Sequence, residues 1–586
     1  MTVNTGGSAS YSNGTWIGFN AGSSGTLTIA GGTYSTANGT QIGGSGTGVF
    51  TMTGGTASTA TTRVGYNAGS NGTATISGGT WTAAYLYIAE AGTGVVTMDG
   101  GLVIVERDLT RGSSGTLNLN AGGTLQIGNG VVGGVLLGGT GDLLNNGTLI
   151  YNSPTNRTYS GAMSGIGAFV KQGTNTLTLS GNNSYDGGTT LNGGTLSLGS
   201  ANAIGTSGPV TFGGGTLQYS ASNSSDNSAR FSNAASQQYS IDTNSQNVTL
   251  ASNLTSTGGS FTKIGAGTLT LTGNNSYDGG TTLLGGTLSL GSANAIGTSG
   301  TVTFAGGTLQ YSASNSSDNS ASFSNAPSQQ YSIDTNNQSV TLATALTSDG
   351  GSFTKLGDGT LTLTGTNTYT GATTVSAGQL VVNGSSSGSA HTVGNGGTLG
   401  GTGTVGTLLV QNGGTISPGN SPGILNVSGN TTWLDGGNYN WQLLDATGAA
   451  GAGWDQLAIT GALDLASLTA GGFNVNVWSL SSALVNGNAQ NFDGIGGIYS
   501  WPIATASGGI TGFDAGDFTI FTGSNNGTTG FTNDFTGGTF SMSQTGNNLY
   551  LNYLGPTPVP EPANAVTVLA LFSGAVLQRR KRVVKH

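Results

Sequence analysis

The chain has 586 residues, of which 110 are glycine and none is cysteine, and only 6% carry a charge. Glutamate occurs three times and the other strong polar helix formers are scarce, which excludes an α-helical or doubly wound α/β protein. The formal net charge of −9 is small for this length, and the abundant Thr, Val, Leu, Tyr and Asn favour strands and turns over disorder.

The absence of cysteine and the excess of acidic residues exclude several kinds of functional site. Without cysteine the chain has no disulfides and no cysteine-based metal sites, and it has only two histidines, His391 and His586. The first 578 residues hold 8 basic against 22 acidic side chains, which offers no surface to nucleic acid. We therefore expect no cofactor, no metal and no nucleic-acid partner.

A five-residue motif recurs through the N-terminal fifth of the chain at intervals of 21 to 24 residues, and each copy is followed by a glycine pair. The copies are 25–29, 48–52, 72–76, 94–98 and 115–119. Alternation of apolar residues with Thr or Ser predicts strands of about five residues separated by glycine turns.

Strands this short cannot bury an apolar face alone, so the repeats predict an all-β, right-handed parallel β-helix. Coils stacked about 4.8 Å apart would pair their backbones along the axis and point Thr to solvent. One internal column is expected to hold equivalent residues of successive coils or their neighbours: Leu27, Phe50, Ala74, Val95 and Leu117.

From about residue 170 the period becomes 92 residues, as Lys171, Lys263 and Lys355 show. Because 92 is four times 23, we interpret each long unit as four coils that keep the register of the same solenoid.

Residues 267–283 (GTLTLTGNNSYDGGTTL) and 359–375 (GTLTLTGTNTYTGATTV) resemble the autotransporter-associated β-strand repeat of bacterial surface and secreted proteins. The resemblance covers roughly residues 165–460. It implies a β-helical, passenger-like stalk outside the cytoplasm and no catalytic residues.

The section 431–554 has no clear period and is rich in aromatic residues, among them Trp433, Trp441, Trp454, Trp478 and Trp501. Because the last coil of a solenoid must be covered, we expect a β-rich cap with these rings in its core. A glycan-binding role for Trp454 or Trp501 is the alternative.

The C-terminus differs from the rest of the chain. A Pro-rich linker (555–562) precedes an apolar segment (563–577) and a basic tail (578–586). As a helix the apolar segment would span about 22 Å, short of the ~30 Å hydrocarbon core, and the basic tail favours a cytoplasmic end.

This tripartite end resembles the PEP-CTERM sorting signal, with Val559, Pro560, Glu561 and Pro562 as the motif and Arg579, Arg580, Lys581 and Arg582 as the basic stop. The resemblance implies an exosortase-type sorting enzyme as partner. It also implies a transient inner-membrane anchor, followed by display on the cell surface or in the extracellular matrix. An ordinary tail anchor is the alternative, and whether the signal is cleaved stays open.

The first ten residues have neither a basic nor an apolar region of a secretory signal. We therefore expect the natural chain to start upstream.

The sequence favours structural roles for the residues that could form catalytic or calcium sites. Asp186 and Asp278 are equivalent residues four coils apart, about 19 Å, too far for a glycosidase pair. Asp226, Asp242, Asp318 and Asp334 read as solvated turns. His391 is expected in an exposed turn, and residues 385–387 (SSS) in an exposed loop.

The sequence thus predicts coils of about 23 residues (1–130), transition coils (131–170), 92-residue repeats (171–376), closing coils (377–430), the cap (431–554) and the C-terminal signal. The predicted function is a non-enzymatic, exported surface or matrix protein, a structural spacer or adhesin, with exopolysaccharide as a candidate partner. The alternatives are a carbohydrate-active β-helix enzyme and a glycan-binding protein.

Overall fold

A computed structural model describes residues 1–523 and 530–557. The chain divides into two compact units, Met1–Leu361 and Thr362–His586, each of which is described by itself.

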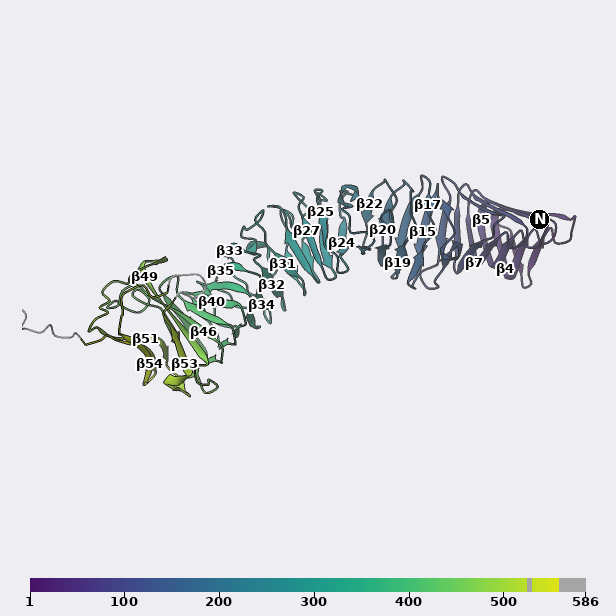
Figure 1. The fold of residues 1–586 in the computed structure, drawn as a ribbon. Coiled ribbons are helices and arrows are strands. Elements are labelled where there is room, and N and C mark those ends of the chain that lie inside the picture. Colours follow the sequence, from purple (N-terminus) through teal and green to yellow (C-terminus); the bar gives the residue numbers. More distant parts are fainter. Residues whose placement is uncertain (524–529, 558–586) are drawn as a thin grey trace, which may run out of the picture. The chain divides into compact units, whose positions relative to one another are not determined.

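The first unit is a parallel β-solenoid whose strands stack as successive rungs (Figure 1). Its early coils contain β1 (Thr2–Val3), β2 (Ser8–Tyr11), β3 (Thr15–Ile17), β4 (Ser24–Ile42), β5 (Thr47–Val64), β6 (Asn71–Ile76), β7 (Thr80–Ile88), β8 (Thr93–Met98), β9 (Leu102–Val105), β10 (Asp108–Arg111), β11 (Gly115–Leu119), β12 (Thr124–Ile127), β13 (Val135–Leu136), η1 (Leu137–Gly139), β14 (Leu143–Leu144) and β15 (Thr148–Asn152).

The later coils of this unit contain β16 (Arg157–Tyr159), β17 (Met163–Ser164), β18 (Ala168–Gln172), β19 (Thr176–Leu179), β20 (Thr189–Leu191), β21 (Thr195–Leu198), β22 (Val210–Phe212), β23 (Thr216–Gln218), η2 (Ser228–Arg230), β24 (Gln238–Asp242), β25 (Val248–Leu250), β26 (Ser260–Ile264), β27 (Thr268–Leu271), β28 (Thr281–Leu283), β29 (Thr287–Leu290), β30 (Val302–Phe304), β31 (Thr308–Gln310), η3 (Ser320–Ser322), β32 (Gln330–Asp334), β33 (Gln338–Leu342) and β34 (Ser352–Leu356); β35 (Gly359–Leu363) contains the division between the units.

The predicted internal column exists, with one correction. Leu27 pairs with Phe50, Phe50 with Ala74, and so on through Val96 to Leu117, and each of these side chains is at most 4% exposed. Val96 takes the place predicted for Val95, which is half-exposed, because side chains alternate between the two faces of a strand.

Strand length is also corrected. β4 and β5 run for 19 and 18 residues instead of about five. Register shifts at Ile29, Ala30 and Thr36 let the backbone turn corners while it stays paired with the next coil. At the corner after β5, Gly65 has a φ of +75°, and a Cβ there would lie 2.2 Å from the carbonyl oxygen of Thr93. Only glycine fits this position.

In the repeat region the strands form separate ladders on the sides of a three-sided coil. The first is β15–β18–β20–β22 and the second is β16–β19–β21–β23–β24–β26–β28–β30. The third is β25–β27–β29–β31–β32–β34. It lies on the same side of the coil as the irregular segment 219–230, since the amide of Ala251, just after β25, donates to Asp226 Oδ2 over 2.9 Å.

The expectation that each repeat spans a whole number of coils is wrong. Followed from Leu177 in the second ladder, four successive pairings arrive at Lys263 in β26, and not at Leu269, the repeat equivalent of Leu177. Each 92-residue repeat therefore advances by four coils and one side. As a result Lys171, Lys263 and Lys355 lie in the first, second and third ladders.

The second unit is also a parallel solenoid and has three ladders, β39–β42–β45–β48–β52, β37–β40–β43–β46–β49–β53 and β38–β41–β44–β47–β51. It contains β36 (Thr373–Val375), β37 (Gly378–Val382), β38 (Ser385–Ser386), β39 (His391–Val393), β40 (Gly397–Gly401), β41 (Thr404–Val405), β42 (Leu408–Val410), β43 (Thr415–Pro418), β44 (Ile424–Val427), β45 (Thr431–Trp433), β46 (Asn438–Leu443), β47 (Gln456–Ile459), β48 (Leu463–Asp464), β49 (Phe473–Ser482), β50 (Val485–Asn486), β51 (Ile498–Ala506), β52 (Ile510–Thr511), η4 (Ala515–Asp517), β53 (Phe518–Phe521), β54 (Thr539–Thr545) and β55 (Asn548–Leu554).

The last part of this unit is where antiparallel pairing appears. β55 pairs with β51 on one edge and with β54 on the other. The aromatic residues pack inward as predicted: Trp433 stacks on Phe473 with ring centroids 4.4 Å apart, and Trp441 lies 5.3 Å from Trp501. The predicted domain boundaries stay predictions.

The predicted apolar helix (563–577) lies outside the described residues. Within the part of the chain that the structure describes, no helix has the length and apolar character needed to cross a membrane.

Candidate functional site

The residues predicted to carry sorting, Val559–Pro562 and Arg579–Arg582, lie outside the described residues. The other candidate residues lie in the coils.

One serine–histidine pair is present in the second unit. Ser386 Oγ lies 2.9 Å from His391 Nε2, and Nδ1 of the same ring lies 2.9 Å from the carbonyl oxygen of Ser389. Both side chains are at most 1% exposed, and burial lowers the pKa of His391 to about 4, so the ring is neutral at pH 7. A nucleophile enclosed in this way cannot meet a polymeric substrate, and the pair serves packing.

This geometry corrects two expectations. His391 lies inside β39 and not in an exposed turn, because the alternation that buries Val393 buries His391 as well. Ser385 and Ser386 belong to β38 and Ser386 is fully buried, so only Ser387 of the expected loop is exposed, in the turn that follows β38. The apolar alternation of His391-Thr-Val393 and Leu408-Leu-Val410, which pair in register, was the available signal.

Each 92-residue repeat buries a lysine in the core. Lys171, Lys263 and Lys355 are 0% exposed, and desolvation lowers the pKa of each to about 8. The ammonium group of Lys263 donates to Thr243 Oγ1 (2.8 Å) and to the carbonyl oxygens of Ile264 (2.8 Å), Gly265 (2.7 Å) and Gly285 (3.1 Å). These lysines close a corner of the coil from within.

The acidic residues weighed as calcium ligands are hydrogen-bond acceptors that link coils. Asp226 accepts from the amides of Ser228 (2.8 Å) and Ala251 (2.9 Å), and its equivalent Asp318 does the same one repeat later. Among the described residues no cluster of three or more His, Asp or Glu could hold a metal ion. Asp186 and Asp278 lie on different sides of the coil because the repeat advances by one side.

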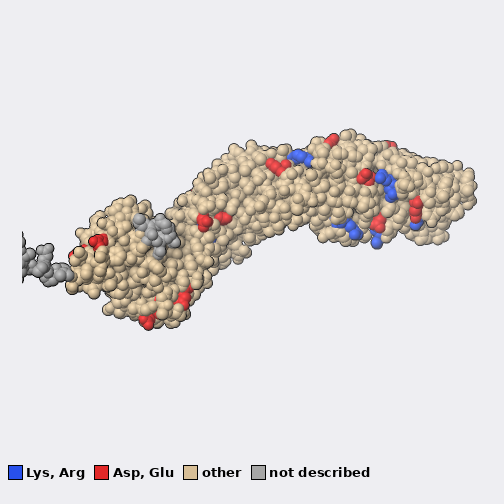
Figure 2. Space-filling view, in the orientation of Figure 1, with Lys and Arg blue, Asp and Glu red and all other residues tan. Residues whose placement is uncertain are grey.

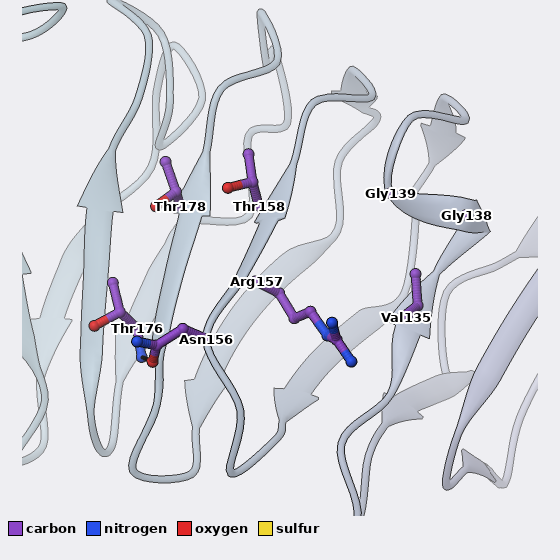
Figure 3. A pocket seen from close by; sticks show the side chains of 8 residues that line it. All are labelled: Val135, Gly138, Gly139, Asn156, Arg157, Thr158, Thr176 and Thr178. Carbon is purple, nitrogen blue, oxygen red and sulfur yellow. Dashed lines mark hydrogen bonds between the residues drawn. The ribbon is translucent and has the colours of Figure 1, made fainter.

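A shallow cleft of about 560 Å³ lies beside β13, β16 and β19 (Figure 3). It is lined by Val135, Gly138, Gly139, Asn156, Arg157, Thr158, Thr176 and Thr178. Its polar groups are hydroxyls, one amide and one guanidinium, and no carboxylate or histidine lines it. The arrangement can hold a polar group by hydrogen bonds, but it offers no acid–base pair.

Charged side chains are few and scattered on the face seen in Figure 2. Arg63 and Glu90 form an ion pair with 2.9 Å between Nε and Oε2. The surface is thus built mainly from neutral polar side chains.

Residues 169–198, 261–290 and 353–382 match the family model Passenger-associated-transport-repeat. These segments begin at Phe169, Phe261 and Phe353, so the buried lysines belong to the matched repeats. The chain thus carries three autotransporter-associated repeats within a parallel β-solenoid.

A stretch of 163 residues, 27% of this chain, is 35% identical to the protein named Adhesin BmaC autotransporter of Brucella suis biovar 1 (strain 1330). It spans only 4% of the length of that relative.

Proposed function

We propose that this protein is an exported, non-enzymatic β-solenoid that acts at the cell surface as an adhesin or structural spacer. The observation that carries the proposal is the three passenger-associated repeats, each built around a lysine and corner contacts that serve folding. The relative named as an autotransporter adhesin supports the same class.

Each 92-residue repeat advances by one side of the coil, and this arrangement supports the proposal. Because equivalent residues appear on successive sides of the coil, the three repeats turn the same outer surface in three directions. Duplication therefore lengthens the solenoid and distributes its surface around the axis. This suits a spacer or an adhesin that meets partners from any direction.

We further propose the handedness of the coil, the role of the C-terminal segment and a partner, each of which the sequence alone supports. The coil is right-handed, in keeping with the general preference of parallel β crossovers. The C-terminal segment is a PEP-CTERM signal recognised by an exosortase-type enzyme, with residues 563–577 as a transient inner-membrane helix. Exopolysaccharide is a candidate partner, whereas the acidic body disfavours nucleic acid.

The test is location in the producing cell. An epitope tag inserted between Ala234 and Ala235, both exposed, leaves the ladders intact. Protease treatment of intact cells should remove the tag while a cytoplasmic marker survives. Recovery of the tagged chain only from the cytosol would overturn the proposal.

The matched control is the same tagged chain ending at Thr557. If residues 558–586 are the sorting signal, this chain should leave the inner membrane fraction but lose its attachment to the cell surface. The mass of the mature C-terminus of the full chain shows whether the signal is cleaved.

A carbohydrate-active β-helix enzyme is the rival function. Turnover of host exopolysaccharide by purified residues 1–557 would favour it over the proposal.

A further inference from the structure

The coils at the N-terminal end carry an aromatic cleft that the proposed function does not use. Trp16, on β3, is 53% exposed, whereas its neighbour Ile17 points inward and is 5% exposed. Each of the chain's seven tryptophans lies in the described part, and the other six are buried or half-buried. Phe19, 51% exposed, lies beside Trp16 with ring centroids 5.7 Å apart.

Trp16 heads an outward column that crosses four coils. It pairs in register with Gln41, Gln41 with Arg63, and Arg63 with Tyr87. The column therefore has an aromatic ring at each end and a planar amide and a guanidinium group between them, at the spacing of the coils, about 4.8 Å.

A cleft of about 360 Å³ opens along this column. Its lining consists of Asn13, Gly14, Trp16, Asn38, Gly39, Gln41 and Arg63. Gly14 keeps the floor low: a Cβ there would lie 3.0 Å from the carbonyl oxygen of Gly39 and 3.3 Å from Cζ2 of Trp16. The volume falls at the lower end of the range of small-ligand sites, about 300–1,000 Å³.

The polar groups of the cleft have hydrogen-bonding capacity to spare. Gln41 Oε1 is buried and has no donor within the described structure. An unpaired buried acceptor is unfavourable, and rotation of the side chain toward the cleft would let a ligand hydroxyl donate to it. Among the described residues, the Arg63 side chain donates a hydrogen bond through Nε alone, to Glu90. Its two terminal nitrogens can therefore donate to a ligand.

The charge of the cleft is balanced. Arg63 pairs with Glu90, and its Cζ lies 5.2 Å from the centroid of the Tyr66 ring and 5.4 Å from that of the Tyr87 ring. An anionic ligand would meet no uncompensated positive charge. A neutral ligand with an apolar face and hydroxyls at its edges fits both the exposed ring and the planar polar groups.

We propose that this cleft binds a neutral polysaccharide, with one sugar ring stacked on Trp16 and its hydroxyls bonded to Asn38, Gln41 and Arg63. The binding site rests on the geometry of the cleft and stands whether or not the chain is exported. Trp16 is the residue expected to carry most of the affinity, because exposed flat rings dominate such contacts.

The test uses the purified full chain in native gels that contain laminarin, mannan, dextran or hydroxyethylcellulose. Polygalacturonate and oligo(dT) serve as anionic comparators. At least one neutral polysaccharide should retard the protein, and Trp16→Ala should raise the dissociation constant about tenfold or more. Trp16→Tyr, which keeps a flat ring, should retain most of the binding, and Trp16→Leu should not.

Phe521→Ala removes an exposed aromatic ring from outside the cleft and should leave binding unchanged. A second readout is independent of the variants: the bound polysaccharide should protect Trp16 from quenching by iodide. Retardation by none of the neutral polysaccharides, equal binding by Trp16→Ala, or preference for polygalacturonate or oligo(dT) would each overturn the proposal.

Discussion

At the scale of the residue, the solenoid buries some polar side chains, because the alternation along a strand places every second side chain in the core. His391 and Lys263 are as deeply buried as their apolar neighbours, although their side chains are polar. Each is tolerated because its nitrogen atoms meet oxygen partners inside the coil.

The buried imidazole predicts acid sensitivity of the second unit. Its pKa is about 4 in the folded protein and about 6.5 when unfolded, so between these values the unfolded chain binds more protons. Stability should fall as the pH drops from about 6.5 to 4, by up to about 3 kcal/mol from this group.

The measurement is urea unfolding at pH 7 and pH 4.5, followed by tryptophan fluorescence. His391→Leu should lose less stability between the two pH values than the natural protein does. Equal losses in both proteins would contradict this role of His391.

The buried lysine predicts a different effect. Lys263→Met keeps the volume but removes the ammonium donor from the Gly265 and Gly285 carbonyl oxygens and from the Thr243 hydroxyl, whereas the Ile264 carbonyl oxygen keeps the Thr243 amide as a donor. The free energy of unfolding should fall by about 1–3 kcal/mol. Arg157→Met, at an exposed site of the same unit, should change it by less than about 0.5 kcal/mol. Similar values for the two variants in chemical denaturation would refute the prediction.

At the scale of the element, the parallel β-solenoid, the inward column and the aromatic core of residues 431–554 follow from alternation and glycine spacing. Val96, and not Val95, is the third residue of its copy, as the other four residues of the column are of theirs, so the register of the repeat distinguishes the two valines. The alternation of residues 391–393 places His391 on the inward face, but the polarity of its ring favoured the exposed turn that we expected.

The advance by one side could not be predicted from the 92-residue period. Successive partners in the second ladder are separated by between 19 and 24 residues, as the pairings from Leu177 to Lys263 show. The corners therefore differ in length from one coil to the next, so the number of residues does not fix the number of coils. The cleft at Trp16 could not be predicted for a related reason, since the exposed rings of Trp16 and Phe19 do not recur at a fixed period.

This geometry predicts which deletions the solenoid accepts. Removal of residues 261–352, one whole repeat, rebuilds the same local sequence at the junction and should leave a cooperative unfolding transition. Removal of residues 261–345 leaves seven residues too many for the β26 position and should broaden the transition and increase proteolysis. Equivalent behaviour of the two deletions would show that the repeat is not the structural unit.

At the scale of the whole molecule, the chain combines a repetitive outer surface of few charged side chains with a core fixed by the strand ladders. The proposed function follows from this combination, because repeats extend a surface and add no reactive group of their own. The proposed glycan cleft lies in the first coils, apart in sequence from the matched repeats. Binding and spacing are thus assigned to different segments of the chain.

The most direct test of the account is the partner of Thr262, measured with pairs of spin labels. The chain has no cysteine, so Cys introduced at two outward sites can be labelled uniquely. In the structure Thr262 pairs with Ser240. A repeat of whole coils would instead place it above Ser232, next to Phe231, which bridges to Val210 of the first ladder. We predict strong dipolar broadening for labels at 240 and 262 and little for labels at 232 and 262; the reverse result would contradict the advance by one side.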